Sequence, residues 1–365
     1  MRFFFFLFCS ISFCGVHAQF VTDFNLNSSI KMDGLYVDGD TLYLAEGWDG
    51  DRIFKVEPNG DVSTFASGLD GPIDIVRRED GTFYVSEWNA ARISQIDGGT
   101  VSIYATVAAG PGPMTIDEDE TIYVTHNVND GSGSITTIDV LGNVSVLAEE
   151  GLLINPGGID FASDGNLYVA NFNNGNILRI EADTTITVLA TIPSDGFWKT
   201  GHLKAKGDSL FVSGIGDHNV YLVELDGSVN VFSGTGAAGH LGGTLSEAEF
   251  NNPNGMGFNE SNSKLFVAKA FGAADYIQQI NWGVSSLTKN EEVNIFEVFP
   301  NPASNILNVL AHNQEVYEVQ LMNLAGELLL STTDLQIDIS GLNKGTYFIV
   351  LQTSSGQESS LFVKN

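Results

Sequence analysis

Short apolar runs separated by turn residues follow one another along most of the chain. The clearest run ends in Tyr or Phe followed by Val or Leu, and it recurs six times. The six copies begin 39 to 55 residues apart, at 42–44, 83–85, 122–124, 167–169, 210–212 and 265–267. No segment keeps a helical period for long. The pattern therefore predicts an all-β fold built from repeats.

The fourth repeat shows the predicted unit best. An inner strand over 155–161 is followed by a Ser-Asp-Gly-Asn turn and by strands over 167–170, 177–180 and 185–189. These strands are short, rich in β-branched residues, and bounded by Gly, Asn and Asp. Six units of about four short strands are typical of a six-bladed β-propeller.

The sixth unit predicts how the ring closes. It stops at 277–282 without an outer strand, and residues 21–24 match the outer strand 62–65 of the first unit. We therefore expect the N-terminal strand to pair into the sixth blade. Such closure removes exposed strand edges, which otherwise invite aggregation.

The fourth unit also resembles an NHL repeat. Residues 157–161, 164–170 and 174–177 read Gly-Gly-Ile-Asp-Phe, Asp-Gly-Asn-Leu-Tyr-Val-Ala and Asn-Gly-Asn-Ile, and 234–256 carry a second match. The resemblance implies an NHL-type propeller of the gluconolactonase-like superfamily over 19–282. Such propellers serve binding, lyase and lactonase roles, so the resemblance implies a fold and no single function.

The N-terminus predicts export. Residues 1–18 have a charged start, an apolar stretch and the ending Val16-His17-Ala18, which is the pattern of a signal peptide. That stretch is too short for a membrane span, and no later stretch approaches one, so we expect no span in the mature chain. Both cysteines, Cys9 and Cys14, lie in the leader. The exported chain must therefore be stabilised by burial without disulfides.

The C-terminus predicts a sorting signal. Residues 283–295 have the composition of a linker, and 296–365 predict a small Ig-like β-sandwich. Phe299-Pro300-Asn301-Pro302, 319–327 and 345–350 follow the order of motifs in the type A C-terminal sorting domain of the type IX secretion system of Bacteroidetes, which this segment resembles. The resemblance implies recognition of 296–365 by the type IX machinery, export across the outer membrane, and attachment to the cell surface or release.

The net charge of the chain restricts the classes of molecule that it is expected to bind. The chain has 45 acidic and 16 basic residues and a formal net charge of −29. Such a field repels nucleic acid and anionic membranes, so we expect neither as a partner. We expect the protein to be a monomer.

Propeller geometry places the candidate site. The first strand of each blade begins, and the second ends, on one face of the ring, and the second strands end in a chemically mixed set that includes carboxylates, an imidazole, an amide and an ammonium group. Such groups beside flat aromatic faces suit a carbohydrate. We therefore predict a non-catalytic protein that binds a glycan or protein ligand through Glu46, Trp48, Glu87, Trp88, His126, Asn171, Trp198, His202 and Lys269, next to Phe172, Phe197 and Phe271.

The alternative is a metal-dependent hydrolase on the same face. Gluconolactonase-like propellers hold a divalent metal there, and the resemblance implies Asp33, Glu46, Asn171 and Asn254 as oxygen donors for a hard cation such as Ca²⁺. A lactonase would use the metal as Lewis acid and a carboxylate as base. Resemblance to amidating-lyase-type NHL propellers implies a third reading, zinc held by His126, His202 and His240.

Overall fold

The computed structural model describes residues 19–282 except 129, 130, 150, 195 and 260, and residues 296–364 except 312–315, 324–327 and 354–355. All regular elements in these ranges are strands, so the predicted all-β class is confirmed. Among the same residues no helix is long and apolar enough to span a membrane. The predicted signal peptide, 1–18, and linker, 283–295, lie outside the described residues. The described chain falls into two compact units, before 283 and after 295.

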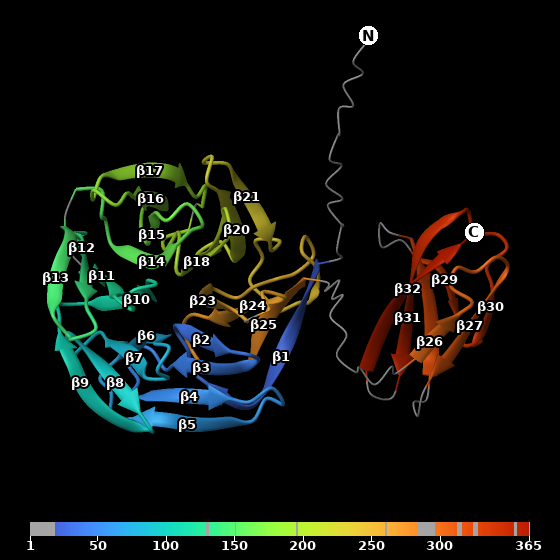
Figure 1. Ribbon diagram of the computed structural model, residues 1–365, viewed down its shortest axis with the longest axis horizontal. Coiled ribbons are helices and arrows are strands. Elements are labelled where there is room, and N and C mark those ends of the chain that lie inside the picture. The colour runs from blue at the N-terminus through green and yellow to red at the C-terminus, as the bar shows by residue number, and fades with distance from the viewer. Residues whose placement is uncertain are drawn as a thin grey trace, which may run out of the picture. The chain divides into compact units, whose positions relative to one another are not determined.

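Six antiparallel sheets make up the first unit, and Figure 1 shows them arranged in a ring. Five sheets are four-stranded, with their strands in chain order. In order along the chain, these strands are β2 (Leu35–Asp38), β3 (Thr41–Ala45), β4 (Arg52–Val56) and β5 (Val62–Ser67); β6 (Pro72–Arg77), β7 (Phe83–Glu87), β8 (Arg92–Asp97) and β9 (Thr100–Thr106); β10 (Pro111–Ile116), β11 (Ile122–Asn127), β12 (Gly133–Ile138) and β13 (Val144–Glu149); β14 (Pro156–Phe161), β15 (Leu167–Asn171), β16 (Asn176–Ile180) and β17 (Ile186–Thr191); β18 (Leu203–Lys206), β19 (Ser209–Gly214), β20 (Asn219–Glu224) and β21 (Val229–Ser233).

The sixth sheet joins the two ends of the first unit. Its strand order is β22 (Gly243–Thr244), β1 (Gln19–Ile30), β25 (Ala274–Trp282), β24 (Lys264–Lys269) and β23 (Pro253–Phe258). The N-terminal strand β1 pairs with β25, with Val21 opposite Ile280, as the sequence predicts. This pairing covers an edge of β25 that would otherwise be exposed.

Glycines let the inner strands approach one another at the centre of the ring. A Cβ atom on Gly158 would lie 2.0 Å from the backbone nitrogen of Leu203, and one on Gly255 would lie 2.1 Å from the carbonyl oxygen of Asp33. Without side chains there, backbones of neighbouring sheets bond directly, as where the N–H of Gly158 donates to the carbonyl of Gly201 at 2.8 Å. The glycine-rich inner strands of the sequence are therefore required by close packing.

The recurring Tyr or Phe of the second strands packs between adjacent sheets. Tyr43 and Phe83 lie with ring centroids 4.5 Å apart, within a core that also buries Val85. Phe211 meets Phe258 of the sixth sheet at 5.3 Å. These aromatic contacts stabilise each sheet against the next, which explains the repeated motif.

The second unit contains two sheets. One has the order β26 (Phe296–Phe299), β27 (Ile306–Ala311), β30 (Gln336–Asp338), and the other the order β29 (Leu328–Thr332), β28 (Val316–Met322), β31 (Gly345–Thr353), β32 (Gly356–Lys364). Leu307 and Ile337 of the first sheet and Leu321 and Ile349 of the second belong to one buried core. The two sheets therefore bury their apolar faces together.

Candidate functional site

The register of the strands places the predicted site positions on one face, here called the mouth. The first residue of four inner strands lies opposite the end of the neighbouring second strand. The pairs are Pro72 with Glu87, Pro111 with His126, Pro156 with Asn171, and Pro253 with Lys269. The strand ends thus meet on one face, as propeller geometry predicts.

Glu87 is held inside its own sheet. Its carboxylate accepts hydrogen bonds from Arg92 Nε at 2.7 Å and Nη2 at 2.8 Å, and from the N–H of Asp70 at 2.6 Å. The hydroxyl of Ser94 donates a fourth bond. The side chain is fully buried. Because a carboxylate has about four acceptor positions, all of them are occupied.

His126 and Asn171 hold the loops that enter their sheets. His126 lies 3.1 Å from the carbonyl of Ala108 through Nδ1 and 2.7 Å from the Thr136 hydroxyl through Nε2. The amide of Asn171 donates to the carbonyl of Leu152 at 2.8 Å. Burial lowers the pKa of His126, against the opposing effect of its backbone hydrogen bonds, so the ring stays neutral near pH 7. These groups therefore fasten loops from inside the protein.

Three polar groups meet where the inner strands of the first, fifth and sixth sheets approach one another. Asn254 Nδ2 donates to Asp33 Oδ1 at 2.6 Å, and His202 Nε2 lies 3.9 Å from the same oxygen. The Asp33 side chain is 23% exposed, whereas that of His202 is 3% exposed. Gly201 makes room for this arrangement, because a Cβ atom there would lie 2.4 Å from Asn254 Oδ1. We call Asp33, His202 and Asn254 the channel cluster.

Asp74 adds a second carboxyl group near the channel cluster. It is almost fully buried, and its Oδ2 accepts the N–H of Met114 at 2.8 Å. Burial raises the pKa of Asp74, although the charges of His202 and Lys204 act in the opposite direction. The sequence does not single out Asp74 as a site residue. Its burial depends on the neighbouring sheet, which the sequence does not show.

Aromatic rings from three loops gather around Trp198. Its ring centroid lies 4.5 Å from that of Phe271, 5.6 Å from Phe197 and 6.3 Å from Phe172. Phe197 is 79% exposed and Phe271 is 46% exposed. The carbonyl of Trp198 accepts the N–H of Gly216 at 2.8 Å, which fixes this loop across the end of β19. We call Phe172, Phe197, Trp198 and Phe271 the aromatic cluster.

The remaining predicted residues lie apart from that cluster or at its margin. Trp48 is 59% exposed in the loop after β3, and Trp88 is half-buried after β7. Lys269 is half-buried at the end of β24, two residues before Phe271. Glu46 is nearly buried and accepts two bonds from Arg52, at 3.0 and 2.6 Å.

The four predicted metal ligands are only partly brought together. Asp33 and Asn254 are in contact, but Arg52 binds the carboxylate of Glu46, and backbone groups bind the amide of Asn171. Within the described ranges no three His, Cys, Asp or Glu side chains are placed to hold a metal ion. The predicted three-histidine zinc set is therefore not found among these residues, and the predicted Ca²⁺ set stays a prediction, with only its members Asp33 and Asn254 described in contact.

Residues 297–365 match the family described as the secretion system C-terminal sorting domain. This domain marks proteins that the type IX system exports and that are attached to the cell surface or secreted. The localisation predicted from the sequence is thereby confirmed. A search of curated protein sequences finds no match to the chain.

Solved structures share the fold of the first unit. Virginiamycin B lyase from Staphylococcus aureus is 18% identical with a TM-score of 0.53, and the alignment covers 72% of this chain and 99% of the lyase. A gluconolactonase from Xanthomonas campestris is 14% identical with a TM-score of 0.53, covering 73% and 95%. An auxiliary nutrient binding protein from Bacteroides thetaiotaomicron is 17% identical with a TM-score of 0.57, covering 73% and 77%. At these identities the likeness shows the β-propeller fold alone.

Proposed function

We propose that the protein is a surface-attached or secreted propeller that binds a glycan at its mouth. Each of the six sheets is one blade, and β1 closes the ring. The second unit is an Ig-like sandwich that carries the sorting signal for the type IX machinery. A signal peptide over 1–18, a linker over 283–295 and a monomeric state complete the proposal.

The aromatic cluster is the observation that carries this proposal. Phe197 and Phe271 expose large apolar rings that water solvates poorly, and both pack on Trp198. Clustered exposed rings on one surface mark interaction sites in soluble proteins. Sugar rings have apolar faces that stack on aromatic side chains and hydroxyl groups that need polar partners. Asp33 and Asn254 supply a carboxylate and an amide on neighbouring inner strands.

The mouth residues divide into two roles in this proposal. The surface that faces the ligand is formed by Trp48, Trp88, Trp198 and Lys269. The buried His202 contributes through its position beside Asp33 in the channel cluster. Glu87, His126 and Asn171 are positioning residues, because each is buried and hydrogen-bonded inside its own sheet.

A hydrolase remains the second candidate because of the channel cluster. A carboxylate beside an imidazole, at 3.9 Å in this structure, is an arrangement that can act in general acid–base chemistry. In that candidate Asp33 or His202 takes a proton from water and Asn254 orients the carboxylate. Purified protein should then open simple lactones, with loss of that activity in Asp33→Asn. No turnover above the rate in buffer would dismiss this candidate.

Glycan arrays test the leading proposal. Trp198→Ala and Phe271→Ala should each weaken binding of captured glycans about tenfold, because each removes a stacking face. Leu141→Ala is the matched control, since Leu141 is 81% exposed in the turn after β12, at the opposite end of its sheet from the mouth. Unchanged binding by both aromatic variants would refute the proposal. Capture of proteins, with no glycan bound, would also refute the glycan assignment.

A further inference from the structure

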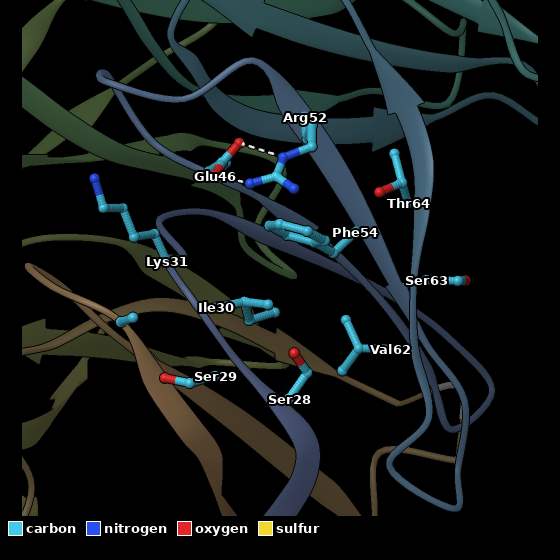
Figure 2. Close-up of a pocket in the computed structure, with 11 residues that line it drawn as sticks. Ser28, Ser29, Ile30, Lys31, Glu46, Arg52, Phe54, Val62, Ser63 and Thr64 are labelled. Carbon is cyan, nitrogen blue, oxygen red and sulfur yellow. Dashed lines mark hydrogen bonds and ion pairs between the residues drawn. The ribbon is translucent and has the colours of Figure 1, made fainter.

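A polar cleft opens at the seam where the ring closes. Its volume is about 410 Å³, and Figure 2 shows it between the end of β1 and the outer strands β4 and β5. This volume lies within the range of about 300 to 1,000 Å³ that is usual for small-molecule sites. We call it the seam cleft. Its lining residues are Ser28, Ser29, Ile30, Lys31, Glu46, Arg52, Phe54, Val62, Ser63, Thr64 and Ala273.

A bulge in β1 shapes this cleft. Asn25 pairs with Tyr276 and Ile30 pairs with Ala274, so β1 advances by more residues than its partner strand. The extra residues swing toward the first sheet, where the N–H of Asn27 donates to the carbonyl of Gly60 at 2.9 Å. Bulges bend a strand and redirect its side chains. Here the bulge forms one wall of the cleft.

The side chains that point into the cleft are apolar at its base and polar at its sides. Figure 2 shows Ile30, Phe54 and Val62 turned toward a shared space, with the hydroxyls of Ser28 and Thr64 beside it. The guanidinium of Arg52 lies over the ring of Phe54 at 4.7 Å. Among the described residues, the Ser28 and Thr64 hydroxyls have no hydrogen-bond partner.

The second sheet contains an ion pair equivalent to Glu46–Arg52, but its carboxylate has no acceptor position left for a ligand. Glu87 and Arg92 occupy the equivalent strand ends, and all four acceptor positions of Glu87 are filled. Phe54 stands where the second sheet has Ser94, so no hydroxyl can donate to Glu46. Among the described residues, Glu46 Oε1 accepts a 2.6 Å bond from Arg52 Nη2, and Oε2 accepts from Arg52 Nε and the N–H of Asp51. Glu46 lines the cleft, and an oxygen with a single donor can accept a second.

Arg52 has hydrogen-bond donors that a ligand bound beside Glu46 could accept from. Its side chain is 43% exposed, against 26% for Arg92, and its Nη1 has no hydrogen-bond partner among the described residues. Burial of Glu46 acts to raise its pKa, but the bonds from Arg52 and from the N–H of Asp51 outweigh burial and hold the pKa below its usual value. The pair is thus ionised and has no net charge. A ligand that donates to Glu46 and accepts from Arg52 needs no charge of its own to pair with these two groups.

Thr64 distinguishes the outer strand of the first sheet from its counterparts. The same ladder position, just after the bulge between third and fourth strands, is apolar and β-branched in the four sheets that follow. Those four residues are Ile103, Val146, Val188 and Val231. A hydroxyl at this position occurs only beside the seam cleft among these five sheets.

We propose that the seam cleft is a binding site for a neutral saccharide. One face of the sugar ring packs on Ile30 and Val62, and its hydroxyls donate to Glu46 and accept from Arg52, Ser28 or Thr64. The assignment rests on this cleft alone and is independent of the glycan site proposed at the mouth. A propeller with both sites would hold an extended glycan at two separate points of its surface.

Isothermal titration of the full chain tests the assignment, with soluble hexasaccharides of glucose, mannose and galactose as neutral probes and one of galacturonic acid as acidic probe. All variants carry Trp198→Ala, so that the mouth is impaired throughout. Thr64→Trp fills the cleft from the wall of the first sheet, and Ser28→Trp fills it from β1. Ile103→Trp is the matched control, because it places the same ring at the equivalent exposed position of the second sheet.

At least one neutral probe should bind the Trp198→Ala protein. Thr64→Trp and Ser28→Trp should each raise its Kd about tenfold or more, and Ile103→Trp should leave it unchanged. The assignment is overturned if no neutral probe binds, if both filling variants leave the Kd unchanged, or if the acidic probe binds more tightly. Failure of the mouth proposal would look different, because there Trp198→Ala and Phe271→Ala would both leave array binding unchanged.

Discussion

Alanine at Glu87 should destabilise the protein far more than alanine at Glu46. Glu87→Ala leaves the Arg92 guanidinium, the Ser94 hydroxyl and the N–H of Asp70 without their acceptor, in a place where the carboxylate is fully buried. Breaking a buried ion pair by removing one partner costs about 3–5 kcal/mol. The Arg52 side chain is 43% exposed, so water can replace the partner lost in Glu46→Ala. Because of this solvent exposure, we expect Glu46→Ala to lower the free energy of unfolding by only about 1 kcal/mol.

Urea denaturation followed by tryptophan fluorescence measures this difference. All four tryptophans lie in the first unit, so the signal reports the propeller and not the sorting domain. Provided that the slope with urea stays constant, the shift in midpoint gives the change in free energy of unfolding. Equal destabilisation by the two variants would show that burial does not determine how much each ion pair contributes to the free energy of unfolding. The role of Glu87 as a buried positioning residue would then be wrong.

Three further predictions concern the pH dependence of stability and the closure of the ring. Burial raises the pKa of Asp74, so ionising this carboxyl costs stability as the pH rises above about 4. Asp74→Asn keeps an acceptor for the N–H of Met114, and it should be at least as stable as the wild type at about pH 7. Urea midpoints should show that this relative advantage is lost near about pH 4. Burial and the hydrogen bond to Asp117 raise the pKa of Tyr123 to about 12, so the folded protein should lose stability between about pH 10 and 12, and Tyr123→Phe should reduce that loss in thermal melts. Deleting residues 19–24 should uncover the edge of β25 and give a protein that self-associates in size-exclusion chromatography; an unchanged monomer peak would show that β1 is dispensable for closure.

Much of the strand pattern could be predicted because it depends on local sequence. The fourth unit was expected to have strands over 167–170 and 177–180, and β15 and β16 lie within one residue of those bounds. Closure by the N-terminal strand was also predictable, because its apolar pattern repeats that of another outer strand. Turn residues and strand period act over a few positions, which a single sequence displays directly.

The site was less predictable because side-chain direction depends on neighbours distant in sequence. Asp33 and Asn254 are 221 positions apart and meet only because the first and sixth sheets adjoin. The sequence placed Glu87 at the mouth, but it did not show that Arg92, across the next turn, draws the carboxylate back into the sheet. The seam cleft escaped prediction for a similar reason. The bulge that forms it appears only when β1 is paired with β25.

The fluorescence of Trp198 during titration with a glycan captured on the array tests the central claim most directly. Trp198 lies at the centre of the aromatic cluster, so a sugar stacked there must change its emission. We expect a saturable change in the wild type and in Trp48→Phe, and its loss in Trp198→Phe, which keeps an aromatic ring and should still bind. Saturable binding with the same spectral change in Trp198→Phe would contradict a glycan site at the mouth.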